Sequence, residues 1–107
     1  MNKDIYTRVI KITGLVQGVG FRPFIYVLAE RFKLSGYVEN RNDGVLIKAN
    51  ADIKTIEDFV DAIQKEAPIA SSVEEIKLLE TDYQNFDQFE IKKSESSSDK
   101  VTEVSPD

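Results

Sequence analysis

Residues 14–24 of the chain read GLVQGVGFRPF, and the elements on either side can be predicted from this stretch. Its three glycines mark a loop that needs unusual backbone dihedrals or a close approach to the backbone. The preceding residues, 5–13 (IYTRVIKIT), are rich in β-branched side chains and predict a strand. The following residues, Arg22–Leu34, predict an amphipathic helix, with Pro23 in its first turn and Gly36 just beyond its end. A strand therefore leads through a glycine-rich loop into a helix.

The rest of the chain adds more strands and a second helix. Further strands are indicated at Tyr37–Asn40, Val45–Ala49, Val73–Thr81 and Phe86–Lys92. The second helix is expected to begin at Thr55, where Asp58 gives a pattern similar to a capping box, and to end before Pro68. The buried stripes of the two helices are expected from Phe24, Leu28 and Phe32, and from Ile56, Phe59, Val60 and Ile63. The order β-α-β-β-α-β, with a further short strand, predicts an α+β ferredoxin-like sandwich: an antiparallel sheet with two helices on one face.

The length of the chain, 107 residues, allows one domain, which we assign to residues 1–93. Residues 94–107 hold four serines in their first five positions and few apolar side chains, so we expect a flexible tail or interdomain linker. No apolar run has the length of a membrane span, and the N-terminus lacks the apolar stretch of a signal peptide. We therefore expect a cytoplasmic location and no membrane partner.

The chain contains neither cysteine nor histidine. This composition excludes a disulfide framework, a zinc–thiolate site, a cysteine nucleophile and a Ser-His-Asp triad. We therefore expect no metal and no cofactor in this domain. Any reaction must depend on positioning and charge stabilisation by backbone amides and the remaining polar side chains.

The charge is unevenly distributed along the chain. Residues 1–50 carry eight Lys and Arg against four Asp and Glu, whereas residues 51–107 carry six against fifteen. The overall net charge of −5 argues against a nucleic-acid partner. Two interpretations of the asymmetry remain: a solvated acidic half, or a positive half that holds an anion site.

The glycine-rich loop has the features of an oxyanion-binding site. Gly18 and Gly20 allow a ligand to approach the backbone, and the unpaired amides and dipole of the following helix favour negative charge. Arg22 adds a planar fork that fits two oxygens of a phosphate or carboxylate, although it could instead form a surface salt bridge. These residues favour an anion site in the positive half.

Known phosphate and nucleotide fingerprints fit this loop poorly. The sequence has neither the GxxxxGK[ST] of a P-loop nor the GxGxxG of a dinucleotide loop. VGFRPF faintly echoes the aromatic strand motif of RNA-binding RRM domains, but Pro23 would break that strand and the candidate third strand VLIKA has no aromatic residue. The loop must belong to another class.

Two blocks, VQGVGFR at 16–22 and GYVENRNDGV at 36–45, give the chain a resemblance to the acylphosphatase family that extends over about residues 5–93. FRPF at 21–24, APIA at 67–70 and VSPD at 104–107 resemble, more narrowly, the N-terminal domain of the HypF family of hydrogenase-maturation carbamoyltransferases. This second resemblance implies that the chain is a domain excised from a larger protein, with its serine-rich end as the linker.

The resemblance implies specific roles for site residues. It places a phosphate-binding loop at Gln17, Gly18, Val19, Gly20, Phe21 and Arg22. It makes Arg22 and Asn40 catalytic, with Arg22 on the phosphate and Asn40 on the attacking water. Gln17 is expected to act through its backbone amide, Phe21 and Phe24 to belong to the core, and Glu39 and Lys48 to be solvated.

The implied function is binding and hydrolysis of carbamoyl phosphate or another acyl phosphate, with the remaining domains of a parent carbamoyltransferase and the phosphate anion as further partners. Two alternatives remain open. The chain could be a free-standing acylphosphatase, or a non-catalytic binding module on the same fold.

Overall fold

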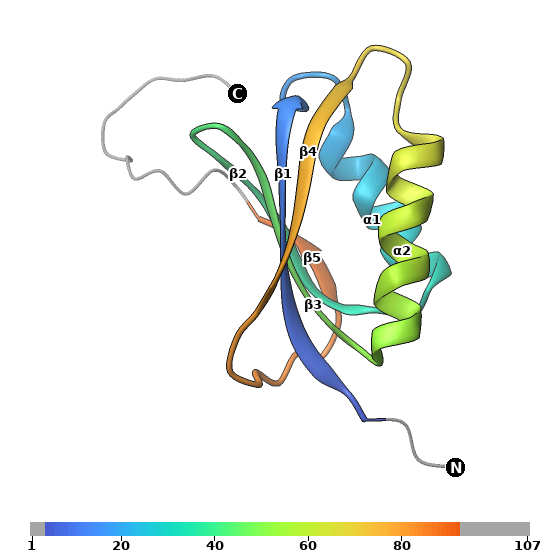
Figure 1. Ribbon diagram of the computed structural model, residues 1–107, viewed down its shortest axis with the longest axis vertical. Helices are drawn as coiled ribbons and strands as arrows, with labels where there is room; N and C mark the ends of the chain where they lie inside the picture. Colours follow the sequence, from blue (N-terminus) through green and yellow to red (C-terminus); the bar gives the residue numbers. More distant parts are fainter. Residues whose placement is uncertain (1–3, 93–107) are drawn as a thin grey trace.

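The computed structural model describes residues 4–92, and the expected linker, residues 94–107, lies outside this range. The elements along the chain are β1 (Tyr6–Leu15), α1 (Phe21–Arg31), β2 (Ser35–Arg41), β3 (Gly44–Ala51), α2 (Ile53–Glu66), β4 (Ser72–Glu80) and β5 (Phe89–Ile91). Both helices lie on one face of the sheet (Figure 1). The predicted α+β sandwich and its element order are confirmed. Neither helix is long and apolar enough to cross a membrane.

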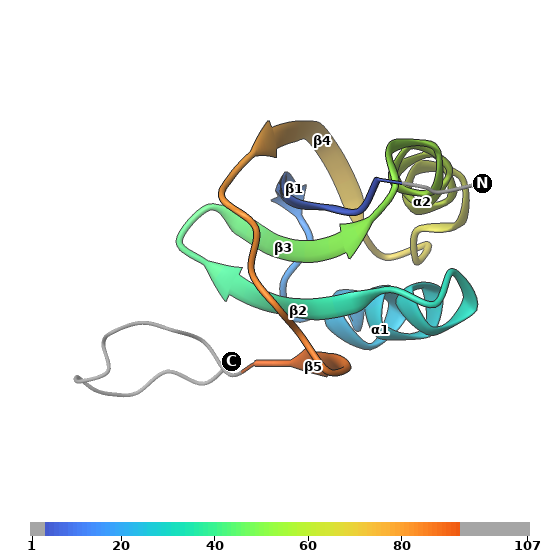
Figure 2. The ribbon, with the colours of Figure 1, turned by 90° about the horizontal axis from the view of Figure 1, so that it is seen from below.

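The sheet is mixed, so the prediction of an antiparallel sheet was wrong for its last strand. The strand order is β4-β1-β3-β2-β5, and β5 pairs in parallel with β2, with Gly36 opposite Phe89. The other pairs are antiparallel. Because β4 runs opposite to β1 and β2, it ends at the same end of the sheet at which β2 begins. The following segment crosses the sheet at that end (Figure 2), and Gln84 within it accepts hydrogen bonds through its carbonyl from Thr7 and Asn50. β5 therefore starts beside the start of β2 and runs in the same direction.

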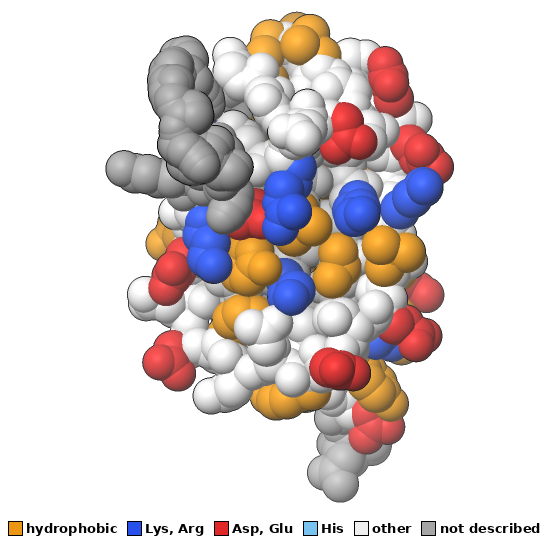
Figure 3. All heavy atoms as spheres, turned by 90° about the vertical axis from the view of Figure 1, so that its left-hand side faces the viewer, with side chains coloured by type: hydrophobic (Ala, Val, Ile, Leu, Met, Phe, Trp, Pro, Cys, Tyr) orange, Lys and Arg blue, Asp and Glu red, His pale blue; other side chains and the backbone are white. Residues whose placement is uncertain are grey.

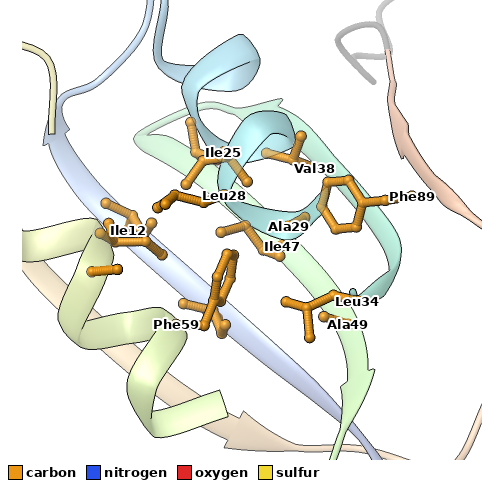
Figure 4. Packing of buried hydrophobic residues seen from close by; sticks show 14 of the residues in the cluster. Ile12, Ile25, Leu28, Ala29, Leu34, Val38, Ile47, Ala49, Phe59 and Phe89 are labelled. Carbon is orange, nitrogen blue, oxygen red and sulfur yellow. The ribbon is translucent and has the colours of Figure 1, made fainter. Parts of the chain in front are cut away.

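The core lies between the sheet and the two helices. Alternate strand residues and one face of each helix meet there, among them Ile12, Leu28, Val38 and Phe59 (Figure 4). The stripe of α2 is as expected, although Val60 is only half-buried. In α1 the fully buried residues are Phe21, Ile25, Leu28 and Ala29, while Phe24 and Phe32 are half-buried.

Both helix boundaries differ from the prediction. α1 ends at Arg31, three residues earlier than expected, and the chain reverses through Lys33, which has a φ of 60°. Gly36 is already part of β2. α2 begins at Ile53, and its N-cap is Asp52, whose carboxylate accepts hydrogen bonds from the Thr55 hydroxyl at 2.7 Å and the Thr55 amide at 3.4 Å. Thr55 lies inside the first turn.

Replacing Asp52 by alanine should lower the free energy of unfolding by about 1 kcal/mol, because the amide of the first turn loses its side-chain acceptor. Chemical denaturation of Asp52→Ala and of Asp58→Ala, an exposed carboxylate on the same helix, would measure this effect. Equal losses in the two variants would contradict the cap at Asp52.

Candidate active site

The loop between β1 and α1 has an open outer surface. Gly18 and Gly20 have φ values of 73° and 78°, a left-handed backbone that side chains rarely adopt. A Cβ added to either residue would meet no atom within 4 Å. A ligand can therefore approach the backbone at both glycines.

The same loop carries a series of unused donors. Within residues 4–92, none of the backbone amides of residues 17–22 donates a hydrogen bond to another residue. Gly20 is the N-cap of α1 and provides no side-chain cap, so the positive end of the helix dipole faces the loop uncovered. Free amides of this kind suit an anion; phosphate binding by residues 17–22 stays a prediction.

Arg22 lies in the first turn of α1, directly after the loop, and is half-buried. Its Nη1 donates a hydrogen bond to the backbone carbonyl of Lys92, just after β5, at 2.9 Å. In the described part of the chain it pairs with no carboxylate, in contrast to Arg31 and Arg41. The salt-bridge alternative is therefore not observed there, and the guanidinium keeps further donors for an anion.

Asn40 comes from β2 and is only 5% exposed. It lies two residues after Val38, which is part of the core, and so its side chain faces the helix side of the sheet. Its Oδ1 is the buried side-chain oxygen that has no hydrogen-bond partner among the described residues. Because an unpaired buried acceptor is costly, this oxygen is a candidate for contact with a water or ligand.

Gln17 uses its side chain in a way that the sequence did not predict. Its Nε2 donates hydrogen bonds to two backbone carbonyls of the β2–β3 hairpin, those of Arg41 and Gly44, the latter at 2.7 Å. We had expected only its backbone amide to contribute. No signal in the sequence indicates the direction of this side chain, because glutamine in a loop is normally solvated.

The prediction that Glu39 is solvated was wrong. Glu39 is 4% exposed, and its carboxylate accepts a hydrogen bond from Nε of Arg41 at 2.5 Å. Lys48 is half-buried and donates to the side-chain carbonyl of Gln84 at 2.9 Å. Phe21 is buried, as predicted.

The sheet face turned away from the helices carries Lys and Arg side chains and is a second candidate for an anion site. Lys and Arg side chains gather there between hydrophobic ones (Figure 3), and Lys11 on β1 lies opposite Lys77 on β4. This face is formed by paired strands, so it provides no row of free amides to combine with the cations. The loop is therefore the better anion site. Among residues 4–92, no group of three Asp and Glu side chains could hold a metal ion.

Residues 8–91 match the acylphosphatase family, and the chain belongs to this family. Two kinds of protein with similar sequences contain a domain of this family. The carbamoyltransferase HypF of Synechocystis sp. is 37% identical over 101 residues, which cover 94% of this chain and 13% of HypF. The acylphosphatase of Bacillus licheniformis is 42% identical over 84 residues, which cover 77% of this chain and 92% of that enzyme.

A solved structure of full-length HypF, in its phosphate- and nucleotide-bound form, superimposes with a TM-score of 0.82 at 35% identity. The match covers 89% of this chain and 13% of that protein. The chain thus spans about an eighth of the HypF proteins that it matches and nearly the full length of a small acylphosphatase. Both resemblances inferred from the sequence, to acylphosphatases and to the N-terminal domain of HypF, are confirmed.

Proposed function

We propose that the chain is a hydrolase domain for acyl phosphates, in which the loop of residues 17–22 binds the phosphoryl group. The observation that carries the proposal is the run of unused amides in that loop, beside Arg22 and at the start of α1. An anion with three peripheral oxygens fits such a set of donors, and charge-assisted hydrogen bonds from Arg22 add to it.

The reaction needs little beyond positioning. An acyl phosphate is a mixed anhydride whose carboxylate leaving group is a weak base, so it departs without a strong general acid. Loop amides and Arg22 stabilise the phosphoryl oxygens during transfer. The unpaired Oδ1 of Asn40 accepts a hydrogen bond from the attacking water and orients it toward phosphorus. A phosphoryl oxygen takes the water's proton, and no cofactor of the domain takes part.

Carbamoyl phosphate is the substrate favoured by the similarity to HypF. In that case the domain would release carbamate and phosphate as the first part of a carbamoyltransferase that matures nickel–iron hydrogenases in the cytoplasm. The remaining domains of such a protein would then be its partners. The similarity to the full length of an acylphosphatase supports a second candidate, a free-standing enzyme for general acyl phosphates.

Inorganic phosphate should bind to the loop and shift its amide NMR signals at residues 17–22. An equal concentration of chloride controls for ionic strength. Shifts confined to the lysines of the opposite sheet face, such as Lys11 and Lys77, would contradict a phosphate site at this loop.

Hydrolysis of carbamoyl phosphate and of acetyl phosphate should be compared on the same preparation. A preference for carbamoyl phosphate supports the carbamoyltransferase assignment, whereas equal rates support a general acylphosphatase. Phosphate binding without hydrolysis of either compound would show a binding module.

A further inference from the structure

The side chain of Gln17 joins two parts of the molecule that are distant in sequence. A glutamine amide nitrogen has two N–H donors, and its two acceptors here are the carbonyls of Arg41 and Gly44, which are 24 and 27 residues further along the chain. These carbonyls belong to the residues that pair at the ends of β2 and β3. One side chain therefore bridges both strands of the hairpin.

This bridge is the hydrogen-bonded connection between the loop and the hairpin in the described part of the chain. The pairing of β1 with β3 reaches no further than Thr13 opposite Gly44. Beyond Leu15 the loop amides at residues 17–20 donate to no other described residue. Val16 and Phe21 anchor the two ends of the loop in the core, and Gln17 adds the hydrogen bonds that hold the loop against the hairpin.

The two joined parts carry the two halves of the candidate site. The loop holds the free amides and leads into Arg22, and the hairpin holds Asn40, next to the bonded carbonyl of Arg41. A nucleophile must be held in line with the phosphorus, and a displacement of about 1 Å can cost on the order of 10²-fold in rate. The rate of the proposed reaction therefore depends on the distance between the loop and the hairpin.

We propose that Gln17 is a positioning residue whose side chain sets the distance and angle between the phosphate-binding loop and Asn40. The proposal rests on the proposed function and adds a role to that site. Both N–H donors of the side chain are used on the hairpin, so the proposal assigns it no hydrogen bond to phosphate.

Two substitutions of Gln17 test this role in the 107-residue chain. Gln17→Glu keeps the shape but removes the donors and faces two carbonyls with a carboxylate, and Gln17→Met removes the donors without adding charge. Gln64→Glu and Gln64→Met are matched controls, because Gln64 is exposed on α2 and its side chain makes no hydrogen bond within residues 4–92. The measurements are kcat on carbamoyl phosphate, inhibition by inorganic phosphate, and the NMR signals of the Asn40 side-chain amide.

Gln17→Met should lower kcat about tenfold or more, while the inhibition constant of phosphate changes less than about threefold. The phosphate donors themselves remain in place, which is the reason for this difference. Gln17→Glu should lower kcat at least as much, and its added negative charge beside the loop should also weaken phosphate binding. The Asn40 side-chain signals should shift in the Gln17 variants and stay unchanged in the Gln64 controls.

Unchanged kcat together with unmoved Asn40 signals would overturn the proposal. An equal loss of phosphate affinity and kcat in Gln17→Met would also overturn it, because Gln17 would then only maintain the fold of the loop. If the parent chain hydrolyses no acyl phosphate, the proposed function fails. The Asn40 signals then decide the positioning role alone: it stands if they shift in Gln17→Glu and falls if they do not.

Discussion

Arg22→Lys should weaken the binding of inorganic phosphate about ten- to hundredfold, although the positive charge is kept. Lysine is a point donor and cannot place two parallel N–H groups on two phosphate oxygens. Losing charge-assisted bonds of this kind costs on the order of 1.5–3 kcal/mol. The guanidinium of Arg22 also reaches the carbonyl of Lys92, and an ammonium on a single stem cannot hold that carbonyl and the phosphate in the same way.

Phosphate titrations of Arg22→Lys and of Arg31→Lys measure this effect. Arg31 lies on the same helix and forms an ion pair with Glu66 of α2, so it provides a control for the general consequences of exchanging arginine for lysine. Phosphate affinity as high as in the parent chain would rule out Arg22 as a ligand.

Local patterns were sufficient to predict the layers of the fold and the place of the loop. Alternating apolar residues predicted which face of β1 meets the helices. The glycines predicted the loop, because glycine readily adopts the positive φ values that the chain has there. The capping residue of α2 was harder to predict from the sequence. Asp52 and Thr55 both have side chains suited to a cap, and the choice depends on where β3 ends, at Ala51.

The features that were missed depend on the direction in which a segment or a side chain runs. The direction of β5 depends on the end of the sheet at which the preceding connection crosses, which no local pattern encodes. Glu39 was expected to be a solvated strand residue, but Arg41 on the same strand pairs with its carboxylate. The Gln17 bridge could not be predicted either, because its acceptors are backbone carbonyls of the β2–β3 hairpin, 24 and 27 residues further along the chain.

Asn40→Ala should separate binding from catalysis. In the proposed mechanism the amide of Asn40 contacts the attacking water and not the bound phosphate. Its loss should lower kcat for an acyl phosphate by roughly 10²-fold or more, with little change in KM or in phosphate affinity, as for an interaction made mainly in the transition state.

The burial of Asn40 makes its effect on stability a necessary part of this experiment. Asn40 is 5% exposed, so its truncation removes packing, but its Oδ1 has no partner among the described residues and its removal leaves no orphaned group behind. The two effects oppose each other, and we expect a change in unfolding free energy of about 1 kcal/mol or less. Asn42→Ala, in the exposed turn two residues further on, is the matched control and should retain full activity. A kcat for Asn40→Ala equal to that of this control would refute the role of Asn40 in orienting water, because the fold and the phosphate loop are the same in both variants.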